Sequence, residues 1–252
     1  MKENRYNHDE IFHHKDLSPF LMVPTLYEIF KPTSVIDIGC GIGNFLKEFK
    51  NNGVIDILGV DGSWADLIEI NKNISESNFI EFNLDEEFIP TKKFDLAISL
   101  EVAEHIDANY SDNFVKTLCN CSDNVLFSAA VPLQGGQNHL NEQWNHYWKL
   151  KFEKEGFTCI DFLKPYFWDN DEIFWWYKQN IVFFTKTPEN FSDYKSNSLS
   201  NVIHPDLFKI KTKELASLQQ IKADYIEFLS GGMSLTFYSK VLLKKLLHKI
   251  SK

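Results

Sequence analysis

The chain has 252 residues, of which 44% are hydrophobic, and a formal net charge of −9. This length predicts one large globular domain, or one domain with an appendage, and no apolar run approaches the roughly 20 residues of a membrane span. The acidic balance disfavours a nucleic-acid partner, which would need a basic face to meet phosphates.

Two further features bear on the compartment. The first residues lack the apolar segment of a signal peptide, and the four cysteines lack metal-finger spacing. Both favour free thiols in a cytoplasmic protein.

The predicted elements begin with a helical segment over residues 1–33, where LSPFLMVPTLYEIFKP reads as a helix bounded by prolines. From residue 34 apolar, β-rich runs alternate with helical stretches. Strands are expected near 34–38, 55–60, 78–82, 93–99, 123–130, 157–163 and 179–186, and helices near 44–51, 63–73, 110–120 and 143–155. Runs that are apolar throughout are typical of strands covered on both faces. The pattern predicts an α/β fold with a doubly wound, mostly parallel seven-stranded sheet over residues 34–188.

A C-terminal extension follows the predicted sheet. Residues 189–210 are rich in Ser and Asn and read as a linker, and residues 211–252 are expected to form two helices, over 211–230 and 234–250. The first carries a seam with 3-4-3 spacing that could form a homodimer: Leu218, Ile221, Tyr225 and Phe228. The second is amphipathic and basic, so it could touch an anionic membrane, although folding back or a dimer contact is favoured.

The stretch VIDIGCGIGNF, residues 35–45, places Gly39, Gly41 and Gly43 directly after the first strand. The spacing is G-x-G-x-G, not the G-x-G-x-x-G of dinucleotide-binding folds, and Asp37 stands inside the strand end. An acid at this point suits a ligand with a cationic amino-acid end better than a diphosphate. The loop therefore favours S-adenosylmethionine over NAD, and a tight strand-to-helix turn without a ligand is the alternative.

Polar residues also follow the next strands. Asp61 ends the second strand, where an acid could accept both hydroxyls of a cofactor ribose, and it could also cap the helix expected over 63–73. After the third strand, Asn83, Leu84 or Asp85 could meet an adenine.

At this point DIGCGIG, GVDG and FDLAISLEVAEHI, in this order, resemble the class I S-adenosylmethionine-dependent methyltransferases over about residues 34–186. The resemblance implies a Rossmann-like fold in which the glycine loop and Asp37 hold the methionine and ribose part, Asp61 the ribose hydroxyls, and the segment around Asn83 the adenine. An Asp is more usual in the family where Asn83 stands. The other expected cofactor contacts are Gly39, Cys40, Gly41, Gly43, Gly62, Leu84 and Leu100.

A narrower resemblance covers VLFSAAVPLQGGQNHLNEQWNHYWKLKFEKEGF and PYFWDNDEIFWWYKQNIVFF. These segments are similar to a subgroup of bacterial methyltransferases linked to sugar and surface-polysaccharide biosynthesis. The resemblance implies an acceptor that is a sugar or nucleotide-activated sugar, methylated on a hydroxyl. Its site would lie in insertions over 131–178, with candidate contacts at Gln134, Asn138, Glu142, Trp168, Asn170, Trp176 and Tyr177. Aromatic faces beside amides and carboxylates suit a sugar, and a packed lid without a ligand is the alternative.

A hydroxyl acceptor needs a base or a metal, because alcohols are poor nucleophiles. His139 is the candidate base, since histidine changes charge near neutral pH, and Glu104 and His105 are the other candidate catalytic residues. If helical, Glu101, Glu104 and His105 share a face, and with His139 they could hold Mg²⁺ or Mn²⁺. Similar Glu-x-x-Glu-His segments bind magnesium in some methyltransferases of ubiquinone biosynthesis and of small-RNA ends. In other relatives the segment packs against the glycine loop without a metal.

Two other functions stay open on the sequence alone. One is N- or C-methylation of another small metabolite. The other is a non-catalytic subunit that binds the cofactor and holds a complex together, for which the C-terminal helices would serve.

Overall fold

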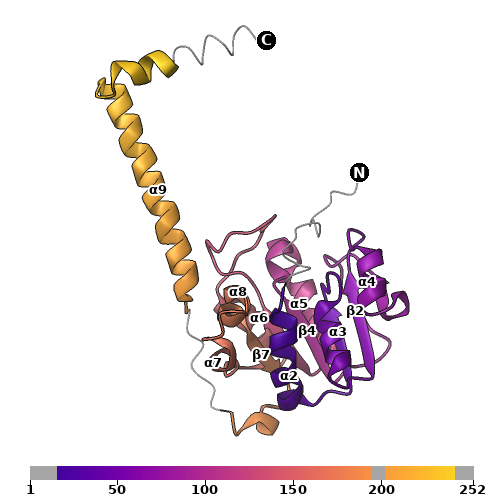
Figure 1. Ribbon diagram of the computed structural model, residues 1–252. Helices are drawn as coiled ribbons and strands as arrows, with labels where there is room; N and C mark the ends of the chain where they lie inside the picture. The colour runs from indigo at the N-terminus through magenta and orange to yellow at the C-terminus, as the bar shows by residue number, and fades with distance from the viewer. Residues whose placement is uncertain (1–15, 195–201, 242–252) are drawn as a thin grey trace. The chain divides into compact units, whose positions relative to one another are not determined.

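The computed structural model describes residues 16–194 and 202–241. The chain divides into two compact units, Met1–His204 and Pro205–Lys252, and the first contains the sheet (Figure 1). The predicted sheet domain thus belongs to one unit together with the N-terminal helix.

The sheet has seven strands in the order β3-β2-β1-β4-β5-β7-β6. Their bounds are β1 (Ser34–Ile38), β2 (Asp56–Asp61), β3 (Phe79–Glu81), β4 (Leu96–Leu100), β5 (Asn124–Ser128), β6 (Thr158–Ile160) and β7 (Val182–Thr185). All pairs are parallel except those of β7, which runs antiparallel to β5 and to β6. The predicted seven-stranded, mostly parallel sheet is confirmed.

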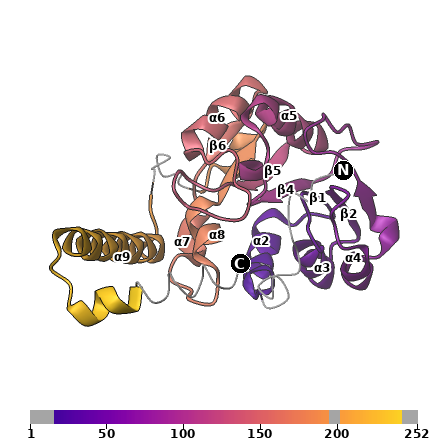
Figure 2. The same ribbon diagram turned by 90° about the horizontal axis from the view of Figure 1, so that it is seen from above.

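Helices cover both faces of the sheet (Figure 2). Because side chains alternate along a strand, Val35 and Ile36 of β1 pack in two different core clusters, one on each face of the sheet. One face carries α2 (Ser18–Phe30), α3 (Asn44–Asn51), α4 (Leu67–Asn73), α7 (Lys164–Phe167) and α8 (Trp175–Asn180); the other carries α5 (Ser111–Cys121) and α6 (Asn145–Lys154). This is the doubly wound arrangement.

Two details of the helices differ from the sequence-based prediction. Helix α4 begins at Leu67 and not near residue 63, because Asp66 caps it by accepting hydrogen bonds from the N–H groups of Ile68 and Glu69. Asp61 is therefore not the cap of that helix. The short helices α7 and α8 were not predicted: they lie after the strand expected near 157–163, and α8, which ends at Asn180, takes the first residues of the strand expected near 179–186 and directly precedes β7.

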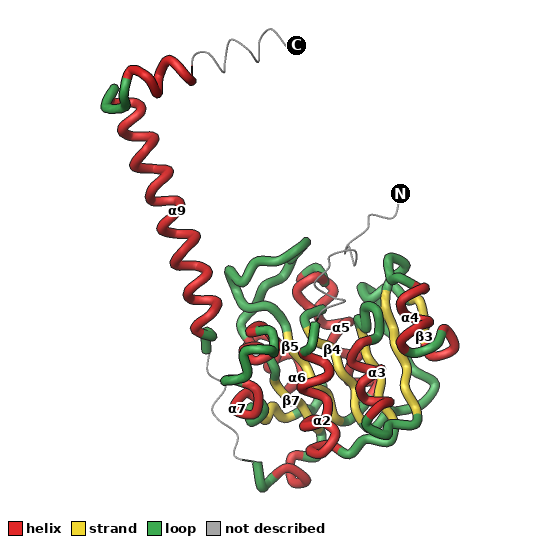
Figure 3. The backbone as a smooth tube through the Cα atoms, in the orientation of Figure 1, coloured by secondary structure: helices red, strands yellow, loops and turns green. Residues whose placement is uncertain are grey.

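The parallel strands β1, β2, β4 and β5 present their carboxyl ends at one edge of the sheet, where loops gather (Figure 3). In open α/β sheets ligands bind in the crevice at this edge. The loops after these four strands therefore position the candidate site.

The second unit contains α9 (Pro205–Ser230) and a further helix described over residues 235–241. Helix α9 starts at Pro205, six residues before the predicted 211, so the expected linker 189–210 is shorter than predicted; proline suits a first helical turn. Most of the basic tail predicted over 234–250 lies outside the described residues. Within the described ranges, no helix combines the length and apolarity needed to cross a bilayer.

Of the predicted seam, Leu218, Ile221 and Tyr225 are exposed on α9. Phe228 is only half exposed, because its ring packs against Tyr238 of the following helix with centroids 5.4 Å apart. The dimer contact stays a prediction, and three of the four seam residues are exposed.

Candidate functional site

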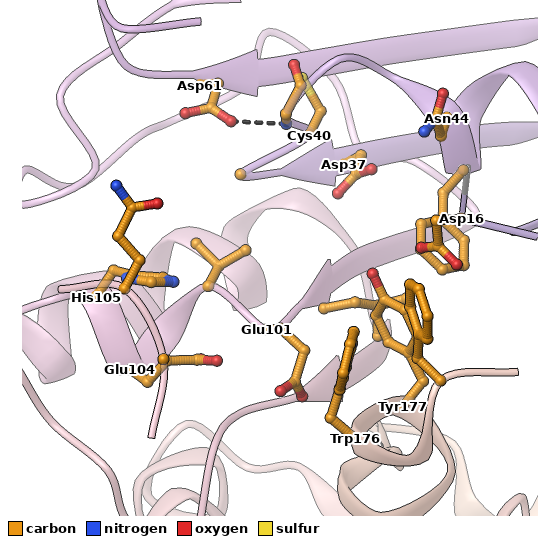
Figure 4. Close-up of a pocket in the computed structure, with 18 of the residues that line it drawn as sticks. Asp16, Asp37, Cys40, Asn44, Asp61, Glu101, Glu104, His105, Trp176 and Tyr177 are labelled. Carbon is orange, nitrogen blue, oxygen red and sulfur yellow. Dashed lines mark hydrogen bonds between the residues drawn. The ribbon is translucent and has the colours of Figure 1, made fainter. Parts of the chain in front are cut away.

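A cavity of about 460 Å³ opens at the carboxyl edge of the sheet. The loops after β1, β2, β4 and β5 line it, together with residues of α8 and the start of α2 (Figure 4). Predicted site residues on its wall are Asp37, Gly39, Cys40, Gly41, Asp61, Leu84, Leu100, Glu101, Glu104, His105, Gln134, His139, Trp176 and Tyr177. Predicted site residues that do not line it are Gly43, Gly62, Asn83, Asn138, Glu142, Trp168 and Asn170.

The glycine loop is tied to the end of β2 by Asp61. One carboxylate oxygen accepts the Gly41 N–H at 2.7 Å, the other accepts the Gly62 N–H at 2.6 Å, and the Trp64 indole also donates to this group. Burial raises the pKa of Asp61 to about 6, although these three hydrogen bonds act in the opposite direction. A carboxylate has about four acceptor positions, so Asp61 retains capacity for a further donor.

The loop itself is crowded against the segment after β4. A Cβ placed on Gly39 would lie 2.5 Å from both methyl carbons of Val102, and Gly39 has a φ of +83°. Asp37, buried below this loop, has a pKa raised well above its usual value by burial and by the nearby Asp61. Gly39 and Gly41 therefore bring the backbone of this loop to one wall of the cavity, beside Asp37 and Cys40.

These residues fit S-adenosylmethionine. A close-approaching glycine loop, buried acids at the ends of β1 and β2, and Leu84 after β3 offer an amino-acid subsite, a ribose acceptor and an apolar contact in the expected order. Asn83 does not line the cavity and its side-chain amide donates to Glu86 at 3.0 Å, whereas Leu84 does line it. Trp64 lines the cavity with its ring packed over Gly62, and sequence reasoning missed it.

Three candidate catalytic groups meet on the opposite wall. Glu104, His105 and His139 each offer a ligand atom, and these atoms lie within 4.8 Å of one another. One oxygen of Glu104 is buried without a hydrogen-bond partner, and burial followed by the charge of Glu101 raises the pKa of this carboxyl well above its usual value. Burial, followed by the proximity of His139, lowers the pKa of His105 to about 4, so its imidazole is neutral near pH 7.

Glu101 lies outside this group, in contrast to the predicted four-residue metal set. Residues 103–105 form a 3-10 turn, and Glu101 has a left-handed backbone with φ of 57°, so the three residues do not share a helical face. The Glu101 carboxylate accepts from the Gln134 amide at 2.9 Å and from the Asn180 amide at 3.0 and 3.1 Å. It faces the wall formed by α8.

Glu142 organises the loop after β5 from outside the cavity. Its carboxylate accepts the Leu133 and Gly135 N–H groups, both at 2.7 Å, and meets Nδ1 of His139 at 2.8 Å. These hydrogen bonds hold the pKa of Glu142 below its usual value, although partial burial acts to raise it. With Nδ1 turned to Glu142, the network assigns the acceptor role to Nε2 of His139.

Aromatic residues form the remaining wall. Phe174, Trp175, Trp176 and Tyr177 line the cavity at the start of α8. Trp168 points elsewhere and packs on His204 with ring centroids 4.6 Å apart, while the Asn170 side chain accepts the Glu172 N–H in a turn. The sequence predicted the cluster of aromatic residues, but it did not predict helix α8, which determines which of the rings face the cavity.

A second group of lining residues was also missed: Asp16, Pro19, Ile42, Asn44, Phe45, Val102, Ile106, Gly135, Gly136 and Gln137. Asn44 and Phe45 directly follow the glycine loop and could have been found from it. Asp16 and Pro19 belong to the N-terminal segment, whose packing over the sheet edge has no local sequence signal.

Comparisons with known proteins agree with this geometry. A family model described as a methyltransferase domain matches residues 12–179, and no curated protein matches the chain. Among solved structures, Streptomyces venezuelae DesVI has 11% identity and a TM-score of 0.54, covering 71% of this chain and 99% of its own. This likeness supports the fold.

Two further solved structures are similar to a lesser degree. The methyltransferase domain of bacterial CtHen1-CN has 20% identity, a TM-score of 0.48, and coverage of 68% of this chain and 99% of its own. Magnesium protoporphyrin IX methyltransferase (ChlM) from Synechocystis PCC 6803, with bound SAH, has 16% identity, a TM-score of 0.46, and coverage of 61% and 80%.

Proposed function

Since the chain belongs to the methyltransferase domain family, we propose that it is an S-adenosylmethionine-dependent O-methyltransferase whose acceptor is a sugar. The observation that carries this proposal is one cavity that joins the glycine loop and Asp61 to the Glu142-oriented His139 and to an aromatic wall. The family membership alone leaves the atom methylated and the acceptor open.

S-adenosylmethionine supplies the methyl group when bound. The glycine loop, Asp37 and Asp61 would hold its amino-acid and ribose parts, with Leu84 and Trp64 beside the adenosine. His139 would accept the proton of the acceptor hydroxyl at Nε2, because Glu142 occupies its Nδ1 side. Gln134 lines the same wall and could orient the acceptor.

The aromatic wall supports a sugar acceptor. Indole and phenol faces of Trp176 and Tyr177 suit the C–H faces of a sugar ring, and neighbouring amides and carboxylates suit its hydroxyls. Among the described residues that line the cavity, none is Lys or Arg. A nucleotide-activated sugar would therefore place its diphosphate outside this lining.

A divalent metal is a second candidate for activating the hydroxyl. The observation that favours it is the Glu104, His105 and His139 group, with its partnerless Glu104 oxygen. Two imidazoles beside one carboxylate depart from the oxygen ligands that Mg²⁺ prefers, and a first-row transition ion such as Mn²⁺ accepts such nitrogen ligands more readily. Such an ion would take the place of His139 as the activating group.

The experiment is transfer of a labelled methyl group from S-adenosylmethionine to a panel of sugars and nucleotide sugars, with and without a chelator. Transfer that is indifferent to chelator supports His139 as the base and rejects the metal. Transfer lost with chelator and restored by Mn²⁺ supports the metal. No transfer to any member, from protein that binds the cofactor, overturns the sugar proposal.

A further inference from the structure

We propose that the acceptor carries a protonated amine, and that Glu101 with Trp176 and Tyr177 forms the subsite that binds it. This inference rests on the proposed function and narrows its substrate class from sugars to amino sugars. The amine anchors the acceptor and is not the group that receives the methyl.

The first step is the state of the Glu101 carboxylate. The Glu101 carboxylate accepts hydrogen bonds from the side-chain amides of Gln134 and Asn180, and the Ser128 hydroxyl also bonds to it, so these side-chain partners are all neutral. The His139 imidazole, from the loop after β5, is hydrogen-bonded to Glu142 and not to Glu101. Glu101 is thus held in a fixed position beside the cavity without a cationic hydrogen-bond partner.

The second step is the aromatic surface beside it. Asn180, which contacts Glu101, lies on α8 four residues after Trp176 and three after Tyr177. Residues at these spacings share a helix face, so the same face carries the amide that fixes Glu101 and the two rings. Figure 4 shows the Glu101 side chain on the side of the cavity where Trp176 and Tyr177 stand. A carboxylate beside aromatic faces is a good site for an ammonium group.

The third step is the charge of the whole cavity. The acids among its lining residues are Asp16, Asp37, Asp61, Glu101 and Glu104, and no described lining residue is Lys or Arg. Bound S-adenosylmethionine, with a sulfonium, an ammonium and a carboxylate, brings one net positive charge. A cationic acceptor would place its charge against Glu101, whereas an anionic acceptor would meet no Lys or Arg in the described lining.

The chemistry also separates the anchor from the nucleophile. A protonated amine has no lone pair, so an amine paired with Glu101 cannot attack the methyl carbon. The hydroxyl oxygen forms the new bond to carbon, its proton passes to His139, and the bond from sulfur to the methyl breaks to release S-adenosylhomocysteine. Glu101 therefore sets which hydroxyl reaches the methyl by fixing the amine.

The test compares glucosamine, galactosamine and mannosamine with their N-acetyl forms, each free and as a nucleoside diphosphate conjugate. N-acetylation removes the positive charge and keeps the ring. We expect methyl transfer to an amino sugar with kcat/KM at least tenfold above that of its N-acetyl form, and the product to carry an O-methyl group. Equal or better use of the N-acetyl form overturns the amine subsite and leaves the proposed function standing. No transfer to any sugar, from protein that binds S-adenosylmethionine, overturns both.

Variants assign the effect to the subsite. In Glu101→Gln, kcat/KM for the amino sugar should fall roughly 10- to 100-fold, the range for losing a hydrogen bond to a charged group, with little change for the N-acetyl form. Trp176→Phe keeps an aromatic face and should retain more of the amine preference than Trp176→Leu. Unchanged cofactor affinity shows that each variant is folded, and the exposed Glu189→Gln is the matched control. Equal losses on both acceptor forms would contradict the assignment.

Discussion

Replacing Gly39 by alanine tests how closely the glycine loop packs against the segment after β4. An alanine at a φ of +83° pays about 1–2 kcal/mol for the left-handed backbone, offset by about 0.4–1 kcal/mol from lower entropy of the unfolded chain. Its Cβ would also lie 2.5 Å from two methyl carbons of Val102, and such overpacking costs about 1–3 kcal/mol. The sum predicts a loss of about 3 kcal/mol in the free energy of unfolding, measured by urea denaturation of the ligand-free protein.

Gly156 provides a matched control for the backbone part. It has the same φ of +83°, but nothing lies within 4 Å of a Cβ added there. Gly156→Ala should therefore cost about 1 kcal/mol, and Gly39→Ala about 2 kcal/mol more. Val102→Ala in the Gly39→Ala background removes both 2.5 Å contacts and should recover much of that difference.

The result that would refute this reasoning is equal destabilisation by Gly39→Ala and Gly156→Ala. The loop would then not be held against Val102, and the close approach that the cofactor site requires would have no steric basis. Titration with S-adenosylmethionine gives a second readout, because a displaced loop would also weaken cofactor binding.

Three further predictions concern the two ends of the cavity. Ionised Asp61 should accept a ribose hydroxyl, and its pKa is raised to about 6, so cofactor affinity should weaken about tenfold per pH unit below pH 6 and level off above pH 7. Calorimetric titration measures this affinity; Asp61→Asn should abolish the pH dependence, and a flat wild-type profile would contradict the prediction. Glu142→Gln should lower kcat about 10- to 100-fold with cofactor affinity unchanged, because the substitution disturbs the orientation of His139. Steady-state kinetics measure this loss, with Glu189→Gln as the control variant, and an unchanged kcat would argue against His139 as the base. Gly136→Ala should lower kcat without loss of stability, because the added Cβ would lie 2.1 Å from Nε2 of His139 and displace the imidazole ring. Thermal unfolding measures the stability and steady-state kinetics the activity. Full activity would show that catalysis does not depend on the position of this ring.

The sheet and the cofactor end of the site could be predicted because their signals are local. Apolar runs, a glycine loop and an acid at the end of β2 each lie within a few residues, and a parallel sheet brings the ends of its strands together. Asp37, Asp61 and Leu84 accordingly line the cavity. Asn83 does not, because its amide is used within its own turn by Glu86.

The acceptor end was harder because its signals depend on packing between distant segments. Helix α8 determines which tryptophans near its start line the cavity, and its six residues are too few to show a helical periodicity in the sequence. Trp168 is held elsewhere because it packs on His204, 36 residues away in sequence. Asp16 and Pro19 reach the cavity only because α2 packs over the same edge of the sheet. The composition of this segment indicated an aromatic pocket, but it did not show which aromatic residues line it.

Glu101 shows most clearly why spacing alone misassigned a role. The Glu-x-x-Glu-His pattern predicts one helical face only if the backbone is helical throughout, and the left-handed residue at 101 breaks that condition. A non-glycine residue in this region costs about 1–3 kcal/mol and persists where surrounding contacts over-determine it. Here the amides of Gln134 and Asn180, from the loop after β5 and from α8, provide those contacts. The strained backbone at Glu101 therefore directs the Glu101 carboxylate toward the aromatic wall, while Glu104 and His105 stay beside His139. This separates the residues expected to bind the acceptor from those expected to accept its proton.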